Sequence, residues 1–340
     1  MAVRRNLITD VAGLRVGHAQ DRAAATGVTV CVFDAPATAS VAILGGAPGV
    51  RDTALLEPEM SVQAVDAIVL SGGSVFGLDA AGGVLNALSR QGRGLLVAGV
   101  RVPIVPQAIL FDLLNGGAKP WLEAPAQARP PYWELGRDAA LAASAGFELG
   151  SVGAGLGATT ANLKGGVGSV SVTTPSGFVV GALAVVNAVG SAVIGDGPHF
   201  WAAPFERDAE YGGRGWPQAM DPAALSLRVK GGAPQSTTLA LVATDAPLDK
   251  AECKRLALMA HDGLARAVRP AHAPMDGDTV FAAATGGNAR ALDAARLTEL
   301  GAAAADCLAR AIARGVHEAT PLPFPGALPA WRALHGHRTP

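Results

Sequence analysis

Two hydroxyl residues, Ser236 and Thr237, stand where the character of the chain changes abruptly. The stretch 198–234 shows no hydrophobic periodicity and carries many Gly and Pro residues, which predicts a long loop. The next run, 236–244, has the composition of a strand. Cleavage before Thr237 would give a chain end with a hydroxyl and an amine of pKa roughly 7.7–8.0, able to act as base for that hydroxyl. The residue types alone also fit an ordinary strand start, because threonine favours strands.

A pair of carboxylates precedes another expected strand. Asp276 and Asp278 are separated only by Gly277, just before the apolar run 279–284. Carboxylates this close push their pKa values apart, which suits one as a base and the other as a hydrogen-bond acceptor. An Asx turn is the ordinary alternative. A calcium loop is disfavoured, because the spacing of oxygen ligands does not continue after Asp278.

Three further positions could carry chemistry. Lys164 lies between glycine-rich runs, Asn187 ends an apolar strand, and the turn 71–74 precedes a helix and could offer N–H groups to an anion. A solvated lysine, a capping residue and a plain turn are the alternatives. The turn lacks the Gly-Lys-Ser/Thr of a phosphate loop, and no HExxH or serine-elbow pattern is present around a plausible nucleophile.

The elements that must position these residues can be predicted from periodicity and turn signals. We expect strands over 28–33, 40–44, 67–70, 169–173, 178–186, 236–244 and 279–284, and helices over 76–90, 249–268 and 292–314, with an irregular Pro-rich tail. Asp249 with Glu252 resembles a capping box. This order predicts one α+β domain over 1–340, with helices covering a mixed sheet.

Composition narrows the functional class. The chain has 340 residues, half of them hydrophobic, and a formal net charge of −1, so neither nucleic acid nor an anionic membrane is an expected partner. Cys31, Cys253 and Cys307 have no metal-binding spacing, which predicts buried free thiols. No apolar segment follows Arg4-Arg5, and no run of about 18 apolar residues occurs, so we expect a cytoplasmic protein.

Taken in order, many segments resemble one family, the self-cleaving L-aminopeptidase/D-esterase peptidases, which also include β-peptidyl aminopeptidases and 6-aminohexanoate-oligomer (nylon oligomer) hydrolases. The matching segments are 70–80, 102–106, 153–159, 163–166, 186–187, 236–239, 242–246 and 275–282. They span nearly the whole chain, so the resemblance is specific. Within it, Met-Asp-Gly-Asp-Thr at 275–279 favours the nylon-oligomer branch.

The resemblance implies a four-layer α-β-β-α sandwich, self-cleaved into fragments 1–236 and 237–340 that assemble as a tetramer of such pairs. It implies Thr237 as the nucleophile, Asp276 and Asp278 as the acidic pair, Lys164 as a catalytic lysine and Asn187 as the oxyanion-side amide. The substrate would be a small amide or peptide, with no metal or cofactor.

The chain departs from the family pattern at two positions. Ser236 stands where the family usually has Asn, so the rate of self-cleavage is open. Phe111 stands where a site tyrosine is expected and, with Gly73 and Ser74, is a candidate for the substrate pocket. Two other functions fit the sequence: an acyl transferase of the ornithine-acetyltransferase type, and an uncleaved homologue that only binds ligands.

Overall fold

The fold was analysed in a computed structural model that describes residues 5–231 and 236–336. The strands are β1 Leu14–Asp21, β2 Thr26–Ile43, β3 Gly49–Arg51, β4 Ala64–Ser71, β5 Leu95–Val97, β6 Val100–Val102, β7 Gln107–Ile109, β8 Val167–Thr173, β9 Val179–Asn187, β10 Thr237–Thr244 and β11 Thr279–Ala284. The helices are α1 Ala80–Arg90, α2 Pro120–Glu123, α3 Tyr132–Leu141, α4 Lys250–Ala267, α5 Ala294–His317 and α6 Trp331–His335.

One mixed sheet organises the molecule. Its order is β3-β7-β4-β2-β11-β10-β9-β8, with β1 paired to β2. β10 runs parallel to β11 and antiparallel to β9, and β11 runs antiparallel to β2. The two strands that follow residue 236 therefore lie between β2 and β9, both of which precede it.

The sheet folds over on itself, because β2 belongs to both halves. Its first part pairs with β1 and β4, its last part pairs with β11, and the register shifts between Val32 and Ala37. Apolar side chains between the halves form a core that includes Phe33, Leu241 and Phe281. The sequence predicted two short strands here, and this prediction was wrong because the exposed residues Asp34, Ala35 and Pro36 lie in an irregular part of one continuous strand.

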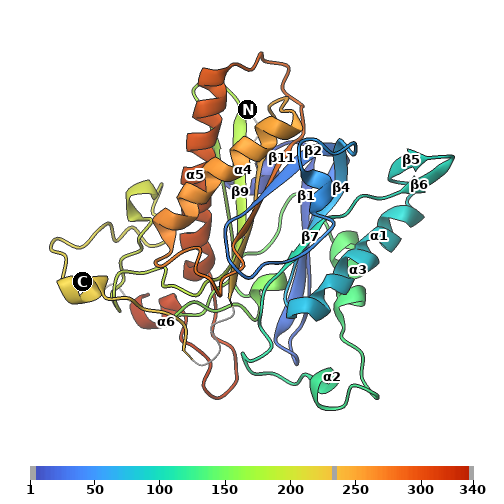
Figure 1. Cartoon of the computed structure of the whole chain (residues 1–340). Helices are drawn as coiled ribbons and strands as arrows, with labels where there is room; N and C mark the ends of the chain where they lie inside the picture. The colour runs from blue at the N-terminus through green and yellow to red at the C-terminus, as the bar shows by residue number, and fades with distance from the viewer. Residues whose placement is uncertain (1–4, 232–235, 337–340) are drawn as a thin grey trace.

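Helices cover both outer faces. α4 and α5 pack on β9, β10 and β11 through one apolar core, and α1 and α3 pack on β2 and β4 through another (Figure 1). Side chains along β10 alternate between the two faces of the sheet, so Leu239 packs in the inner core and Ala240 packs in the core under α4 and α5. The result is the predicted four-layer α-β-β-α arrangement.

The helix ends and the C-terminal tail agree with the sequence-based expectations in part. Asp249 accepts a hydrogen bond from the Glu252 amide, and the Glu252 side chain accepts one from the Asp249 amide, which confirms the capping box. The expected helix 76–90 is a 3₁₀ segment, Ser74–Asp79, followed by α1. The Pro-rich tail contains α6, whose Trp331 is anchored by packing against Phe200 rather than by local periodicity.

Some features had little signal in the sequence. β1 and α3 were not predicted: β1 forms its ladder with β2 alone, and α3 is a short helix whose buried residues, apart from Tyr132, are Gly and Ala. All three cysteines, each inside the described part of the chain, are buried and free, as expected. Among the helices of residues 5–231 and 236–336, none is both long and apolar enough to cross a membrane.

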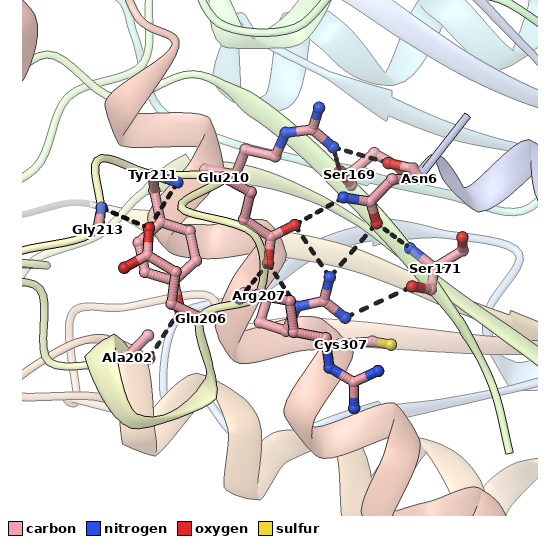
Figure 2. Close-up of polar contacts among 12 residues, drawn as sticks. Asn6, Ser169, Ser171, Ala202, Glu206, Arg207, Glu210, Tyr211, Gly213 and Cys307 are labelled. Atoms are coloured by element: carbon pink, nitrogen blue, oxygen red, sulfur yellow. Dashed lines mark hydrogen bonds and ion pairs between the residues drawn. The ribbon is translucent and has the colours of Figure 1, made fainter. Parts of the chain in front are cut away.

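A buried polar cluster ties the long loop to α5. Glu210 of the loop receives two hydrogen bonds from the Arg310 guanidinium, at 2.6 and 2.9 Å, and one from Asn6 at 2.7 Å (Figure 2). The Glu210 and Arg310 side chains are 5% and 3% exposed. The loop after 198 is therefore fixed by specific contacts, although it has little regular structure.

Candidate active site

Thr237 is the first residue of β10 and is almost fully buried. Its hydroxyl donates a hydrogen bond to the carbonyl oxygen of Ser236 at 2.5 Å. The hydroxyl thus lies against the carbonyl group of the peptide bond that the sequence singled out. The preceding residues 232–235 lie outside the described part of the chain.

The turn before β11 meets this peptide group from the other side. The Gly277 amide donates to the Ser236 carbonyl oxygen at 2.9 Å, and the Ser236 amide approaches the Met275 carbonyl at 3.3 Å. A Cβ at 277 would lie 2.5 Å from Thr237 Oγ1, so only glycine allows this approach. A preorganised N–H on the oxygen where negative charge would develop is the arrangement of an oxyanion site.

Asp278 links the start of β10 to a histidine. Its Oδ1 accepts from the Thr238 amide at 3.0 Å. Its Oδ2 lies 2.8 Å from His272 Nδ1 and accepts from the His272 amide at 2.9 Å. Asp278 is fully buried, and these contacts fix its carboxylate at the start of β10.

Asp276 is the less well compensated of the two acids. Its Oδ1 accepts from the Gly277 amide at 3.2 Å and its Oδ2 from the Val189 amide at 3.3 Å, both long contacts. Burial and the nearby Asp278 carboxylate raise its pKa far above the ordinary range. Asp276 is therefore the acid of the pair whose ionised form the fold disfavours.

Asn187 faces Thr237 across the strand pair, because the two are register partners at the ends of β9 and β10. Its Oδ1 accepts from the Thr159 amide at 3.0 Å and from Lys230 Nζ at 3.2 Å. Its Nδ2 donates to the Phe111 carbonyl at 3.0 Å. The amide is therefore anchored on both sides beside the nucleophile candidate.

Lys164 is buried in the loops around these residues. Its ammonium donates to the carbonyls of Gly155, Ala158 and Gly165 at 2.8–2.9 Å, which engages all three of its hydrogens. Burial lowers its pKa to about 7. Within the described chain no hydrogen bond joins Lys164 to Thr237, and its contacts here hold the glycine-rich segments together.

A cavity of about 470 Å³ opens next to Asn187. Its walls include Phe111, Asp112, Asn115, Thr159 and Lys230. Gly73 and Ser74 do not line it. Their amides instead bind the Asp112 carboxylate and the Leu110 carbonyl, at 2.8 and 2.9 Å, so the expected anion-binding turn holds an internal carboxylate.

Sequence reasoning missed several groups of this site. The Gly277 amide, His272, Asp112 and Lys230 carry no motif, although His272 and Lys230 each lie within seven residues of a predicted site residue. In the described ranges, no three His, Cys, Asp or Glu side chains are grouped as a metal site would require.

The sequence is similar to those of known peptidases and amide hydrolases. The profile of peptidase family S58 matches residues 6–327. An uncharacterized aminopeptidase of Mycobacterium tuberculosis is 44% identical to 97% of this chain, over 98% of its own length. A 6-aminohexanoate-oligomer endohydrolase of Paenarthrobacter ureafaciens is 26% identical, over 90% of this chain and 84% of its own.

Solved structures share the architecture. A beta-aminopeptidase from Burkholderia sp. superposes with a TM-score of 0.68 at 25% identity, covering 98% of this chain and 95% of its own. The L-aminopeptidase D-Ala-esterase/amidase of Ochrobactrum anthropi, described as a variant of the Ntn hydrolase fold, gives a TM-score of 0.66 at 20% identity over 97% and 94%. The latter likeness concerns the fold alone. With its α-β-β-α layers and the family match over nearly its whole length, the chain belongs to peptidase family S58 and is a hydrolase of amide bonds.

Proposed function

We propose that the chain cleaves itself before Thr237 and then hydrolyses small amides or peptides with the Thr237 hydroxyl as nucleophile. The observation that carries this proposal is the contact between Thr237 Oγ1 and the Ser236 carbonyl, whose oxygen also accepts the Gly277 amide. Nucleophile, electrophile and oxyanion donor are thus already together in the uncut chain.

Self-cleavage would begin with attack of Thr237 Oγ1 on the Ser236 carbonyl carbon. Asp276 or Asp278 accepts the hydroxyl proton, the C–N bond breaks, and the nitrogen takes a proton to become the Thr237 amine. The product is an ester between Ser236 and the Thr237 side chain. Water then hydrolyses this ester, releasing the Ser236 carboxylate and restoring the hydroxyl.

In the cut enzyme the freed amine of Thr237 would take over as base, since its ordinary pKa of roughly 7.7–8.0 suits neutral pH. Thr237 Oγ1 attacks the substrate carbonyl, the leaving amine departs with a proton, and water hydrolyses the ester. The Gly277 amide and the Asn187 side chain would donate to the oxyanion. One such donor is typically worth about 3–4 kcal/mol of activation free energy.

The cavity wall favours substrates that carry a protonated amine. Asp112 is buried there, and its oxygens accept from the Thr26 hydroxyl and the Gly73 amide, at 2.6 and 2.8 Å. Burial raises the pKa of Asp112, so a protonated substrate amine beside it would stabilise its ionised form. We therefore expect hydrolysis of alanine p-nitroanilide and little of its N-acetyl derivative; equal rates would remove Asp112 from substrate recognition.

Intact mass tests the central proposal. Purified wild-type chain should separate into fragments of 236 and 104 residues, the second beginning with Thr237, whereas Thr237→Ala should remain a single chain of 340 residues. A wild-type chain that stays whole after prolonged incubation would contradict both the cleavage and the mechanism that depends on it.

A further inference from the structure

Lys230, which belongs to no sequence motif, lies close to the groups that are proposed to react. Its side chain donates to Asn187 Oδ1 at 3.2 Å, and its amide donates to the Val189 carbonyl at 2.8 Å. The Val189 amide in turn donates to Asp276 Oδ2 at 3.3 Å. Val189 therefore connects the backbone of Lys230 to the carboxylate of Asp276.

The contact between Lys230 and Asn187 determines the orientation of the Asn187 side-chain amide. Both the Lys230 ammonium and the Thr159 amide donate to Oδ1, so a reversed amide would place its NH₂ against two donors. The observed orientation directs Nδ2 toward Phe111, a wall of the cavity, where one of its two hydrogens is used. The second hydrogen is available for a substrate oxygen.

The charge of Lys230 is not neutralised by a close carboxylate. Among the described residues no Asp or Glu oxygen lies within 4 Å of its ammonium. Desolvation lowers its pKa to about 7, against the attraction of Asp276 and Asp112. Its charge also contributes to the lowered pKa of Lys164 and opposes the rise in the pKa of Asp276. Lys230 therefore acts electrostatically on groups from three different segments around the site.

We propose that Lys230 is a positioning residue for hydrolysis: its ammonium fixes the Asn187 amide and holds a positive charge opposite Asp276. The inference rests on the proposed function, because it assigns Lys230 to the reaction at Thr237. It adds a basic residue from the segment just before the cleavage point, six residues from Ser236.

The test compares Lys230→Met, which removes donor and charge, with Lys230→Arg, which keeps both. Arg228→Met is the matched control, because Arg228 is a nearby cation that pairs with exposed Asp196. Self-cleavage is followed by intact mass during cell-free translation. Hydrolysis of alanine p-nitroanilide by cut protein is measured from pH 5 to 10, with melting temperature on the same samples.

For Lys230→Met we expect kcat to fall about tenfold or more with KM within about twofold, as for a lost contact to the transition state. The apparent pKa of kcat should rise, because a removed positive charge no longer favours deprotonation of Asp276, Asp112 or Lys164. Lys230→Arg should restore most of the rate and the wild-type pKa, and Arg228→Met should match wild type.

Wild-type kinetics in Lys230→Met, or equal losses in Lys230→Met and Lys230→Arg with no pKa change, would overturn the role. If wild-type protein cleaves itself but does not hydrolyse the anilide, the pH dependence of the self-cleavage rate replaces kcat as the measurement. The same differences between the variants are then expected in that rate. A wild-type chain that never cuts refutes the proposed function instead, so the two failures are distinguishable.

Discussion

At the scale of single residues, the two neighbouring acids of the site, Asp276 and Asp278, have different hydrogen-bonding surroundings. Asp278 accepts hydrogen bonds from the Thr238 and His272 amides, and its Oδ2 also lies 2.8 Å from His272 Nδ1. Asp276, two residues away, has only long contacts and a raised pKa. A carboxylate that is poorly stabilised is a stronger base once ionised, at the expense of the stability of the fold.

This cost predicts a pH dependence of stability. Because the folded chain holds the Asp276 proton more tightly than the unfolded chain, the free energy of unfolding should fall as pH rises from about 4 toward the raised pKa. Asp276→Ser removes the titration. In the uncut Thr237→Ala background, we expect the loss of stability between pH 5 and pH 8 to be smaller by at least about 1 kcal/mol.

Urea unfolding of the two proteins at both pH values measures this difference. The Thr237→Ala parent is the control, because it has the same covalent state and keeps Asp276. Identical pH dependence in the two proteins would show that Asp276 is ionised as easily in the fold as in the unfolded chain.

At the scale of elements, the parallel pairing of β10 with β11 is what assembles the site. It brings the turn before β11 alongside the first residue of β10, and the antiparallel pairing with β9 brings Asn187 to the same point. A parallel bridge between Ser236 and Asp276, three residues before the first pair of the ladder, extends the pairing to the Ser236–Thr237 peptide group.

The close approach of these elements gives a steric prediction. Gly277→Ala should slow self-cleavage about 10²-fold, because the added methyl would displace Thr237 Oγ1 and a shift of about 1 Å costs that much. Gly146→Ala, where a Cβ meets nothing within 4 Å, is the matched control. Time-resolved intact mass gives the rate, and an unchanged rate in Gly277→Ala would mean that the turn need not touch the nucleophile.

The strongly periodic elements were the ones that could be read from the sequence. α4 and α5 carry long apolar faces, and β8 to β11 are short apolar runs between turn signals. Thr237, Asp276 and Asp278 could be singled out as candidates because they lie at or just before the start of such strands, and the family resemblance favoured them over the ordinary readings. The Gly277 amide and Lys230 were not, since a backbone donor has no sequence signature and Lys230 acts through contacts made across the fold.

At the scale of the whole molecule, the contacts across residue 236 must hold two fragments together after the proposed cleavage. The Glu210–Arg310 pair is one of them, because Glu210 belongs to 1–236 and Arg310 to 237–340. It is bidentate and almost fully buried, so its geometry is of the kind that matters energetically. Asn6 and Arg314 extend the same junction, since the Arg314 guanidinium donates to the Asn6 carbonyl at 2.7 Å.

Neutralising one partner should therefore weaken the assembled pair. Glu210→Gln leaves the Arg310 charge buried, and we expect a loss of about 3 kcal/mol in the free energy of unfolding. Asp34→Asn is the control, because its partner Arg15 is in the same fragment and the pair is half exposed, so the expected loss is under about 1 kcal/mol. Equal unfolding curves for the two variants would show that the Glu210–Arg310 pair does not stabilise the junction.

The position of β10 and β11 within the sheet has a consequence for the order of folding and cleavage. Both strands lie between β2 and β9, so after the proposed cleavage they would be flanked on both sides by strands of the other fragment. The continuous chain can place these strands in an intramolecular folding reaction, whereas separated fragments would have to meet at a concentration-dependent rate. Once cut, the protein would retain a structure that it no longer folds into readily, and its working lifetime would be governed by its rate of unfolding.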